Sequence, residues 1–174
     1  MKKTILAVLT GFAICAGQRS DAACSSKIHY ASLPNESSAQ EFAPSSFSLD
    51  LVRNVLWRGH AGERMSVCDE SAKFYCFKSR PISFAVPKRR PRIGQSWTVN
   101  RRKYSLVGEQ RLHLLGVDTT VLVIAGDDSH TDTKHHHYYY SMEMGLLALR
   151  LPPAPESEPR FVVAQSNCGF GARD

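Results

Sequence analysis

The sequence lacks the short motifs on which many catalytic sites are built. It contains no G-x-S-x-G nucleophile elbow, no H-E-x-x-H zinc motif, no P-loop and no G-x-G-x-x-G after a strand. It also has no C-x-x-C pair, the motif typical of disulfide-exchange enzymes. We therefore expect a protein that is not an enzyme and that uses no cofactor.

Long helical and long apolar stretches are missing as well. No segment repeats its apolar residues with a sustained period of 3.6, so we expect little helix. The longest apolar run, residues 5–16, is too short to anchor the chain stably in a bilayer. It follows Lys2 and Lys3 and precedes small residues that end at Ala22 and Ala23. This layout predicts a cleaved signal peptide over residues 1–23.

The surroundings of the first cysteines argue against a lipid anchor. Ile14 directly before Cys15, and Asp21 three residues before Cys24, fit a lipid-attachment box poorly. We therefore expect a soluble periplasmic or secreted protein rather than a lipoprotein. Cleavage would leave roughly 151 residues, enough for one domain with a real core.

The charge of the chain is only mildly basic. The net charge is +6 at pH 7, and removal of residues 1–23 would lower it to about +4. That density is far below that of a dedicated nucleic-acid-binding protein. We expect no nucleic-acid partner.

The four cysteines of the mature chain predict two disulfides, because an even number in an oxidising compartment favours pairing. A hairpin centred on Ala72 would place Cys68 opposite Cys76, where side chains on one face can bridge. Cys24 and Cys168 remain, near the two ends of the mature chain, and we expect them to form the second disulfide.

The pattern along the chain predicts a mainly β, single-domain antiparallel meander with the form of a curved sheet or half-barrel. Residues 24–46 are rich in Ser, Ala, Asn and Pro and predict a loosely structured lead-in, with a helical turn over 37–42. Residues 47–174 predict one antiparallel β domain. The expected strands are FSLDLV, VLWRG, the arms of the cysteine hairpin, PISFAVP at an edge, GQSWTVN, KYSLVGE, RLHLLGV, DTTVLVIAG, HTDTKHHHYYYS, GLLALRL and RFVVAQ. HAGE predicts a turn at Gly62.

Residues 94–149 resemble a layout found in exported bacterial β proteins. A G-x-x-W strand opens a meander at Gly94-Gln95-Ser96-Trp97, and an aromatic-rich strand turns at a glycine into an apolar one in YYYSMEMGLLAL. The resemblance implies a curved antiparallel sheet or half-barrel and implies no activity. We expect Trp97 and Leu115 to be buried and Lys134 to be exposed.

The stretch HTDTKHHHYYY concentrates four histidines in eleven residues. If it is extended, His135 and His137 share one face with Tyr139, and His136 lies on the other face with the remaining tyrosines. Two imidazoles per face fall short of the ligands that zinc prefers. We therefore expect a surface strand rather than a metal site, with His135, His137 and Asp132 as weak candidate ligands. A third ligand would have to come from His113 or His60.

Two basic clusters flank GQSWTV. If that stretch is a strand with its neighbour folded back, the clusters would form one patch for an anionic partner. The interpretation that we favour is that these cations protect turns and edges from aggregation, and the patch is the alternative. The seven residues are Lys88, Arg89, Arg90, Arg92, Arg101, Arg102 and Lys103.

These features together predict a small exported protein that acts by binding. It would be an inhibitor-type or immunity-type partner of another exported protein, or a periplasmic carrier with a β-walled groove. The expected partner is another exported protein or an anionic component of the envelope, and the oligomeric state is open. The alternatives are an enzyme or metal-binding protein that uses His and Asp of residues 127–137, and an envelope-associated structural protein.

Overall fold

The computed structural model describes residues 24–32, 46–68, 73–127, 135–151 and 160–172. Within these ranges every long regular element is a β-strand and no helix occurs. The strands are β1 Lys27–Ser32, β2 Phe47–Asp50, β3 Val55–Arg58, β4 Ala61–Arg64, β5 Ser66–Val67, β6 Phe74–Lys78, β7 Ser83–Pro87, β8 Ser96–Val99, β9 Arg102–Leu114, β10 Val117–Asp127, β11 His135–Ser141, β12 Gly145–Leu151 and β13 Arg160–Ala164. The predicted mainly β class is confirmed.

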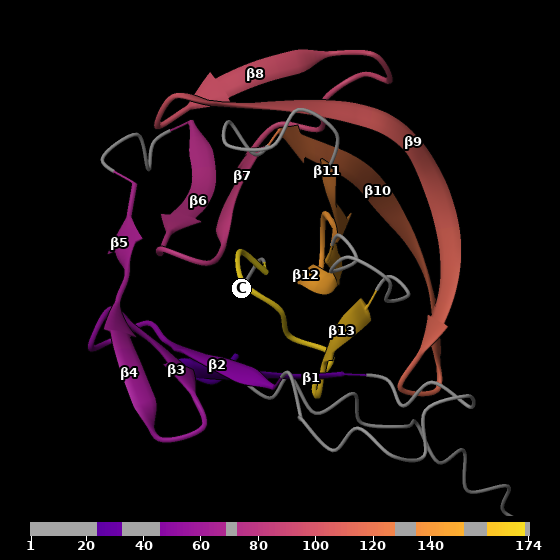
Figure 1. The fold of residues 1–174 in the computed structure, drawn as a ribbon. Coiled ribbons are helices and arrows are strands. Elements are labelled where there is room, and N and C mark those ends of the chain that lie inside the picture. The colour runs from indigo at the N-terminus through magenta and orange to yellow at the C-terminus, as the bar shows by residue number, and fades with distance from the viewer. Residues whose placement is uncertain (1–23, 33–45, 69–72, 128–134, 152–159, 173–174) are drawn as a thin grey trace, which may run out of the picture.

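The strands form two antiparallel sheets. The ten-stranded sheet has the order β4-β3-β2-β1-β13-β12-β11-β10-β9-β8, and β5-β6-β7 form the second sheet. Strands β8 to β13 are neighbours in chain order, which confirms a meander over the second half of the chain. The large sheet curves around the C-terminal segment, which lies near the centre of the view (Figure 1).

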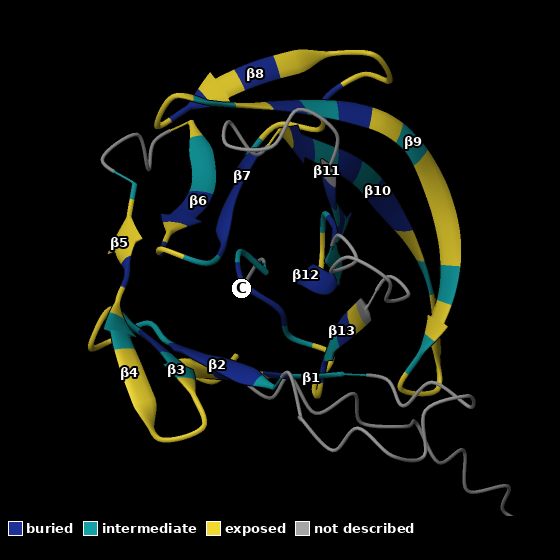
Figure 2. Cartoon of the chain, in the orientation of Figure 1, coloured by how far each residue is buried: buried dark blue, intermediate teal, exposed yellow. Residues whose placement is uncertain are grey.

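The concave face of this sheet carries the core. Along β8 and at the start of β1 and β9, where Ile28, Tyr30, Tyr104 and Leu106 lie, every second residue is buried, as expected for strands with one face inward. Dark blue segments accordingly alternate with exposed ones along β8 in Figure 2. Trp97 is 8% exposed, as predicted, and its indole Nε1 donates to the Ala85 carbonyl at 3.0 Å.

Side chains of the protein itself fill the space inside the curve. The Phe84 ring of β7 lies 5.1 Å from the Tyr138 ring and 5.9 Å from the Tyr140 ring. From the C-terminal tail, Phe170 packs edge-on against Phe77 at 4.9 Å. Strand β7 and the tail therefore plug the concave face.

Buried tyrosine hydroxyls fasten this plug to the sheet. Tyr138 donates to the Ser83 carbonyl at 2.6 Å, and Tyr140 donates to the Gly171 carbonyl at 2.7 Å. Tyr30 donates to the Leu146 carbonyl at 2.9 Å and accepts from the Phe170 amide at 3.2 Å. Burial raises the pKa of Tyr30 and also that of Tyr104, whose hydroxyl hydrogen-bonds Ser83.

The cysteine pairs are those predicted from the sequence. Cys68 and Cys76 lie opposite each other, one step beyond the Val67–Phe77 pair, with their Cα atoms 5.5 Å apart. Cys24 and Cys168 have Cα atoms 5.6 Å apart and join the start of β1 to the C-terminal tail. Residues 69–72 of the predicted hairpin lie outside the described residues.

The expectation of a loose lead-in over 24–46 is wrong for residues 27–32. They form β1, which lies between β2 and β13 near the middle of the large sheet. The residues alternate as a strand, with Ile28 and Tyr30 buried, but the lead-in's many small and polar residues hid this signal. The predicted helical turn over 37–42 lies outside the described residues.

Three further expectations are corrected. KYSLVGE and RLHLLGV are one strand, β9. Gly108 does not end it, because this residue pairs with Val123 of β10 next to a β-bulge, and the pairing with β10 continues on both sides. Leu115 is 53% exposed, because it lies in the β9–β10 turn with a φ of 52°. The predicted turn at Gly62 is instead a strand, and the chain turns at Gly59, whose φ is 56°.

Candidate functional site

The β9–β10 hairpin extends beyond the strands that flank it. Strand β8 pairs with β9 only up to Ser105, and β11 pairs with β10 only from Leu122 onward. Between these limits, β9 and β10 pair only with each other among the described residues. We call residues 107–120 the ribbon (right-hand side of Figure 1).

No residue of the ribbon is buried. The segment nevertheless carries large exposed apolar side chains: Val107 is 51% exposed, Leu115 in the turn is 53% exposed and Val117 is 38% exposed. An isolated two-stranded ribbon is only marginally stable in water. Exposed apolar side chains gathered on one element are typical of a surface that another molecule covers.

Charged groups accompany these apolar side chains. His113 Nδ1 lies 2.8 Å from Asp118 Oδ1 across the ribbon. Arg90, from the loop before β8, forms a 2.7 Å ion pair with Glu109. This mixture of exposed aliphatic and charged side chains is typical of protein–protein interfaces.

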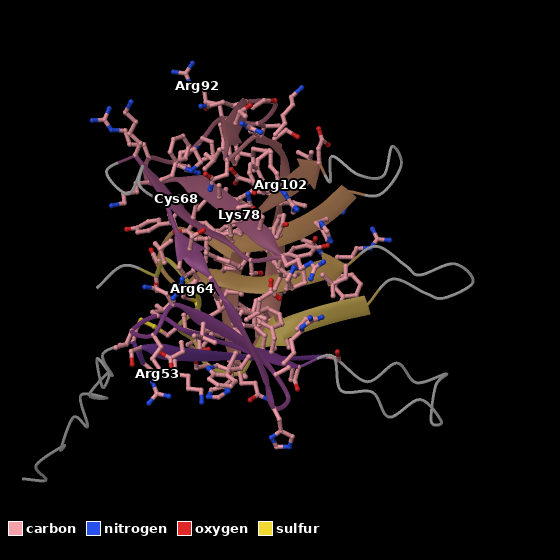
Figure 3. The ribbon with its side chains drawn as sticks, turned by 60° about the vertical axis from the view of Figure 1, so that its left-hand side comes forward. Arg53, Arg64, Cys68, Lys78, Arg92 and Arg102 are labelled. Atoms are coloured by element: carbon pink, nitrogen blue, oxygen red, sulfur yellow. A yellow bond between two sulfur atoms is a disulfide. The ribbon has the colours of Figure 1, made fainter. Side chains whose placement is uncertain are left out.

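The two basic clusters do not meet as one patch. Residues 88–92 lead into β8, where the Gly94 amide donates to Leu106, while Arg101 lies in the turn after β8, where Val99 pairs with Arg102. The clusters therefore stand at opposite ends of β8, and Figure 3 shows Arg92 and Arg102 apart. Lys88 lies 5.0 Å above the Tyr75 ring. The ion pair of Arg90 with Glu109 places the first cluster beside the ribbon.

The histidine stretch is a strand whose faces alternate as predicted. His136, Tyr138 and Tyr140 are buried, whereas His137 and Tyr139 are half-buried on the opposite face. The expectation of a surface strand is wrong for the face that carries His136, because this face points into the core, where Tyr138 and Tyr140 pack against Phe84. His136 is 7% exposed and its ring lies 6.2 Å from that of Tyr138.

Among the candidate ligands that the structure describes, His113 and His60 lie apart from this strand. Asp132 and Lys134 lie outside the described residues. His113 contacts Asp118 in the ribbon, and His60 lies in the β3–β4 turn. Among the residues that the structure describes, no three His, Cys, Asp or Glu side chains are grouped so that they could hold a metal ion.

The ribbon was missed in the sequence because its apolar alternation predicts a half-buried strand. The only local signal was the pair Leu114-Leu115 directly before Gly116, which places large apolar side chains at a turn. Exposure there depends on where the neighbouring strands end, and no local pattern encodes that.

Comparison with protein-family models, with curated proteins and with solved structures finds no match to this chain. In the described part of the chain, no helix has the length and apolar character needed to cross a membrane.

Proposed function

We propose that the protein is exported and acts by binding another exported protein through the ribbon. The observation that carries this proposal is that Val107, Leu115 and Val117 are exposed on a two-stranded element without a buried residue. Partner binding would remove these side chains from water, and each square ångström of apolar surface buried contributes about 25 cal/mol.

The filled concave face supports partner binding over a carrier role. A carrier for a small molecule needs an enclosed, largely apolar pocket. Here, Phe84 and Phe170 occupy the centre of the curved sheet and contact its aromatic side chains. The Cys24–Cys168 bridge holds the tail that carries Phe170 in this place.

The partner would present acidic groups near the apolar contact. Arg89 and Arg92 are exposed in the loop before β8. Arg90 of the same loop forms the ion pair with Glu109 of the ribbon. Complementary charges at the rim of an interface chiefly raise the association rate and the specificity. The complex should therefore form more slowly at high salt.

Export is supported by the signal-like segment over residues 1–23 and by the two disulfides. N-terminal sequencing of the protein from the exported fraction tests this part. A mature protein that begins at Ala23 or Cys24 is expected. Full-length protein found only inside the cell with free thiols would refute export.

Affinity purification of tagged protein from the native exported fraction tests the partner. We expect one stoichiometric protein with the wild type and its loss with the double substitution Leu115→Asn and Val117→Thr. Val52→Asn is the matched control, since Val52 is 75% exposed in the β2–β3 turn. Equal recovery with both variants would refute the assignment to the ribbon.

A further inference from the structure

The outer face of the N-terminal strands carries an open groove. It has a volume of about 570 Å³ and is lined by residues of β1, β2 and β3 and of the turns around them. The core side of the same strands is formed by Ile28, Leu49 and Leu56, which are buried. The groove therefore lies on the convex side of the sheet, away from the plug.

One row of cross-strand neighbours crosses this face. His29 pairs with Ser48, Ser48 with Trp57, and Trp57 with Gly62. Residues directly opposite each other share a face of the sheet. The His29 and Trp57 side chains therefore project from the same side, and both line the groove.

The Trp57 indole lies across Gly62. A Cβ atom at residue 62 would be only 2.8 Å from Cζ3 of the ring and 3.0 Å from Cε3 and Cη2. Glycine thus lets the ring rest against the neighbouring strand. Trp57 is half-buried, so part of the indole is covered and part remains open to the groove.

Polar and cationic groups surround this ring. Lys27, His29 and His60 are exposed and line the groove, and no side-chain partner occurs for them among the described residues. Asp50 accepts a 2.9 Å hydrogen bond from the Arg53 amide and lies 3.9 Å from the Arg53 guanidinium. Lys27 lies directly across the strands from the same Asp50, so Lys27, Arg53 and Asp50 together leave one net positive charge at the groove, which can meet a negative group.

We propose that this groove binds an acidic saccharide, with a sugar ring against Trp57 and its carboxylate or sulfate near Lys27. A sugar ring has an apolar C–H face that packs on an aromatic face, and its hydroxyl groups need side chains that donate and accept hydrogen bonds. The groove offers both. This inference is independent of the proposed partner surface, because the ribbon and the groove lie on different strands.

Indole N–H signals in a proton–nitrogen correlation spectrum test the proposal. The chain has two tryptophans, and the Trp97 indole is buried and hydrogen-bonded to Ala85. Titration with a galacturonic acid trisaccharide should shift the Trp57 signal in a saturable way and leave the Trp97 signal in place. A neutral glucose trisaccharide should bind at least about fivefold more weakly.

Matched variants locate the site. Gly62→Ala should displace the indole and weaken binding about tenfold. Gly108→Ala, where a Cβ would meet nothing within 4 Å, should leave binding unchanged. Lys27→Gln should weaken binding of the acidic sugar and not of the neutral one. Trp57→Leu provides a second variant if Gly62→Ala does not fold, and its binding is followed through the backbone amide signals of Gly59 and Gly62, because it lacks the Trp57 indole.

Three results would overturn the proposal. The first is no shift of the Trp57 signal at about 10 mM acidic trisaccharide. The second is equal binding of the acidic and neutral sugars. The third is binding that neither Gly62→Ala nor Trp57→Leu weakens.

Discussion

Removal of the Cys24–Cys168 bridge should destabilise the protein more than removal of Cys68–Cys76. The bridges span 144 and 8 residues, respectively. In the chain-entropy model, closing these loops lowers the free energy of folding by about 5 and about 2.6 kcal/mol. Cys76 is buried, so its replacement by alanine adds a packing loss of about 1 kcal/mol. The long bridge should still contribute more.

Urea denaturation of two double variants under non-reducing conditions, which keep the remaining bridge intact in each, measures this difference. Cys24→Ala with Cys168→Ala should lower the free energy of unfolding by about 5 kcal/mol, and Cys68→Ala with Cys76→Ala by about 3 to 4 kcal/mol. Hydrogen exchange should also speed up at the Phe170 amide in the first variant alone. Equal losses, or a larger loss for the short bridge, would refute the entropic reasoning.

Three further outcomes follow from the core and the ribbon. Phe170→Ala should lower the free energy of unfolding by about 3 to 5 kcal/mol in urea, because it empties the centre of the curved sheet; a loss below about 1 kcal/mol would show that the tail is not part of the core. Leu115→Ser should change that free energy by no more than about 0.5 kcal/mol, since the side chain is exposed, and a large loss would contradict its position. Tyr30 and Tyr104 have raised pKa values in the folded state, so the stability that they confer is complete below about pH 10 and is lost as pH rises further. Urea midpoints that do not fall between about pH 9 and 11 would argue against the burial of these phenols.

Local patterns predicted the parts of the fold that depend on neighbours along the chain. GLLALRL was predicted as a strand and forms β12 over the same residues, because glycine at a φ of 77° begins it after a turn. The Cys68–Cys76 pair followed from hairpin register alone. Both features need only short-range geometry.

Long-range placement was beyond the sequence. Nothing in KIHYAS indicates that β1 pairs with β13, from the other end of the chain. The two-residue period placed His136 with Tyr138 and Tyr140 but did not say which face points inward. Strand pairing and sheet curvature decide which face points inward. That His136, Tyr138 and Tyr140 are buried together could therefore be seen only in the folded chain.

The candidate sites depend on the same long-range information. The ribbon exists because β8 and β11 end before β9 and β10 do, and the groove exists because β1, β2 and β3 share an outer face. The basic clusters were visible in the sequence, but the length of β8 keeps them apart.

Site-specific photo-crosslinking in the native exported fraction tests the central claim most directly. A photoreactive phenylalanine analogue replaces Leu115 in one sample and Val52 in the other, because both side chains are exposed and lie in turns. The ribbon assignment predicts one dominant protein adduct at residue 115 and none at residue 52. The same adducts at both positions, or no adduct at residue 115, would contradict it.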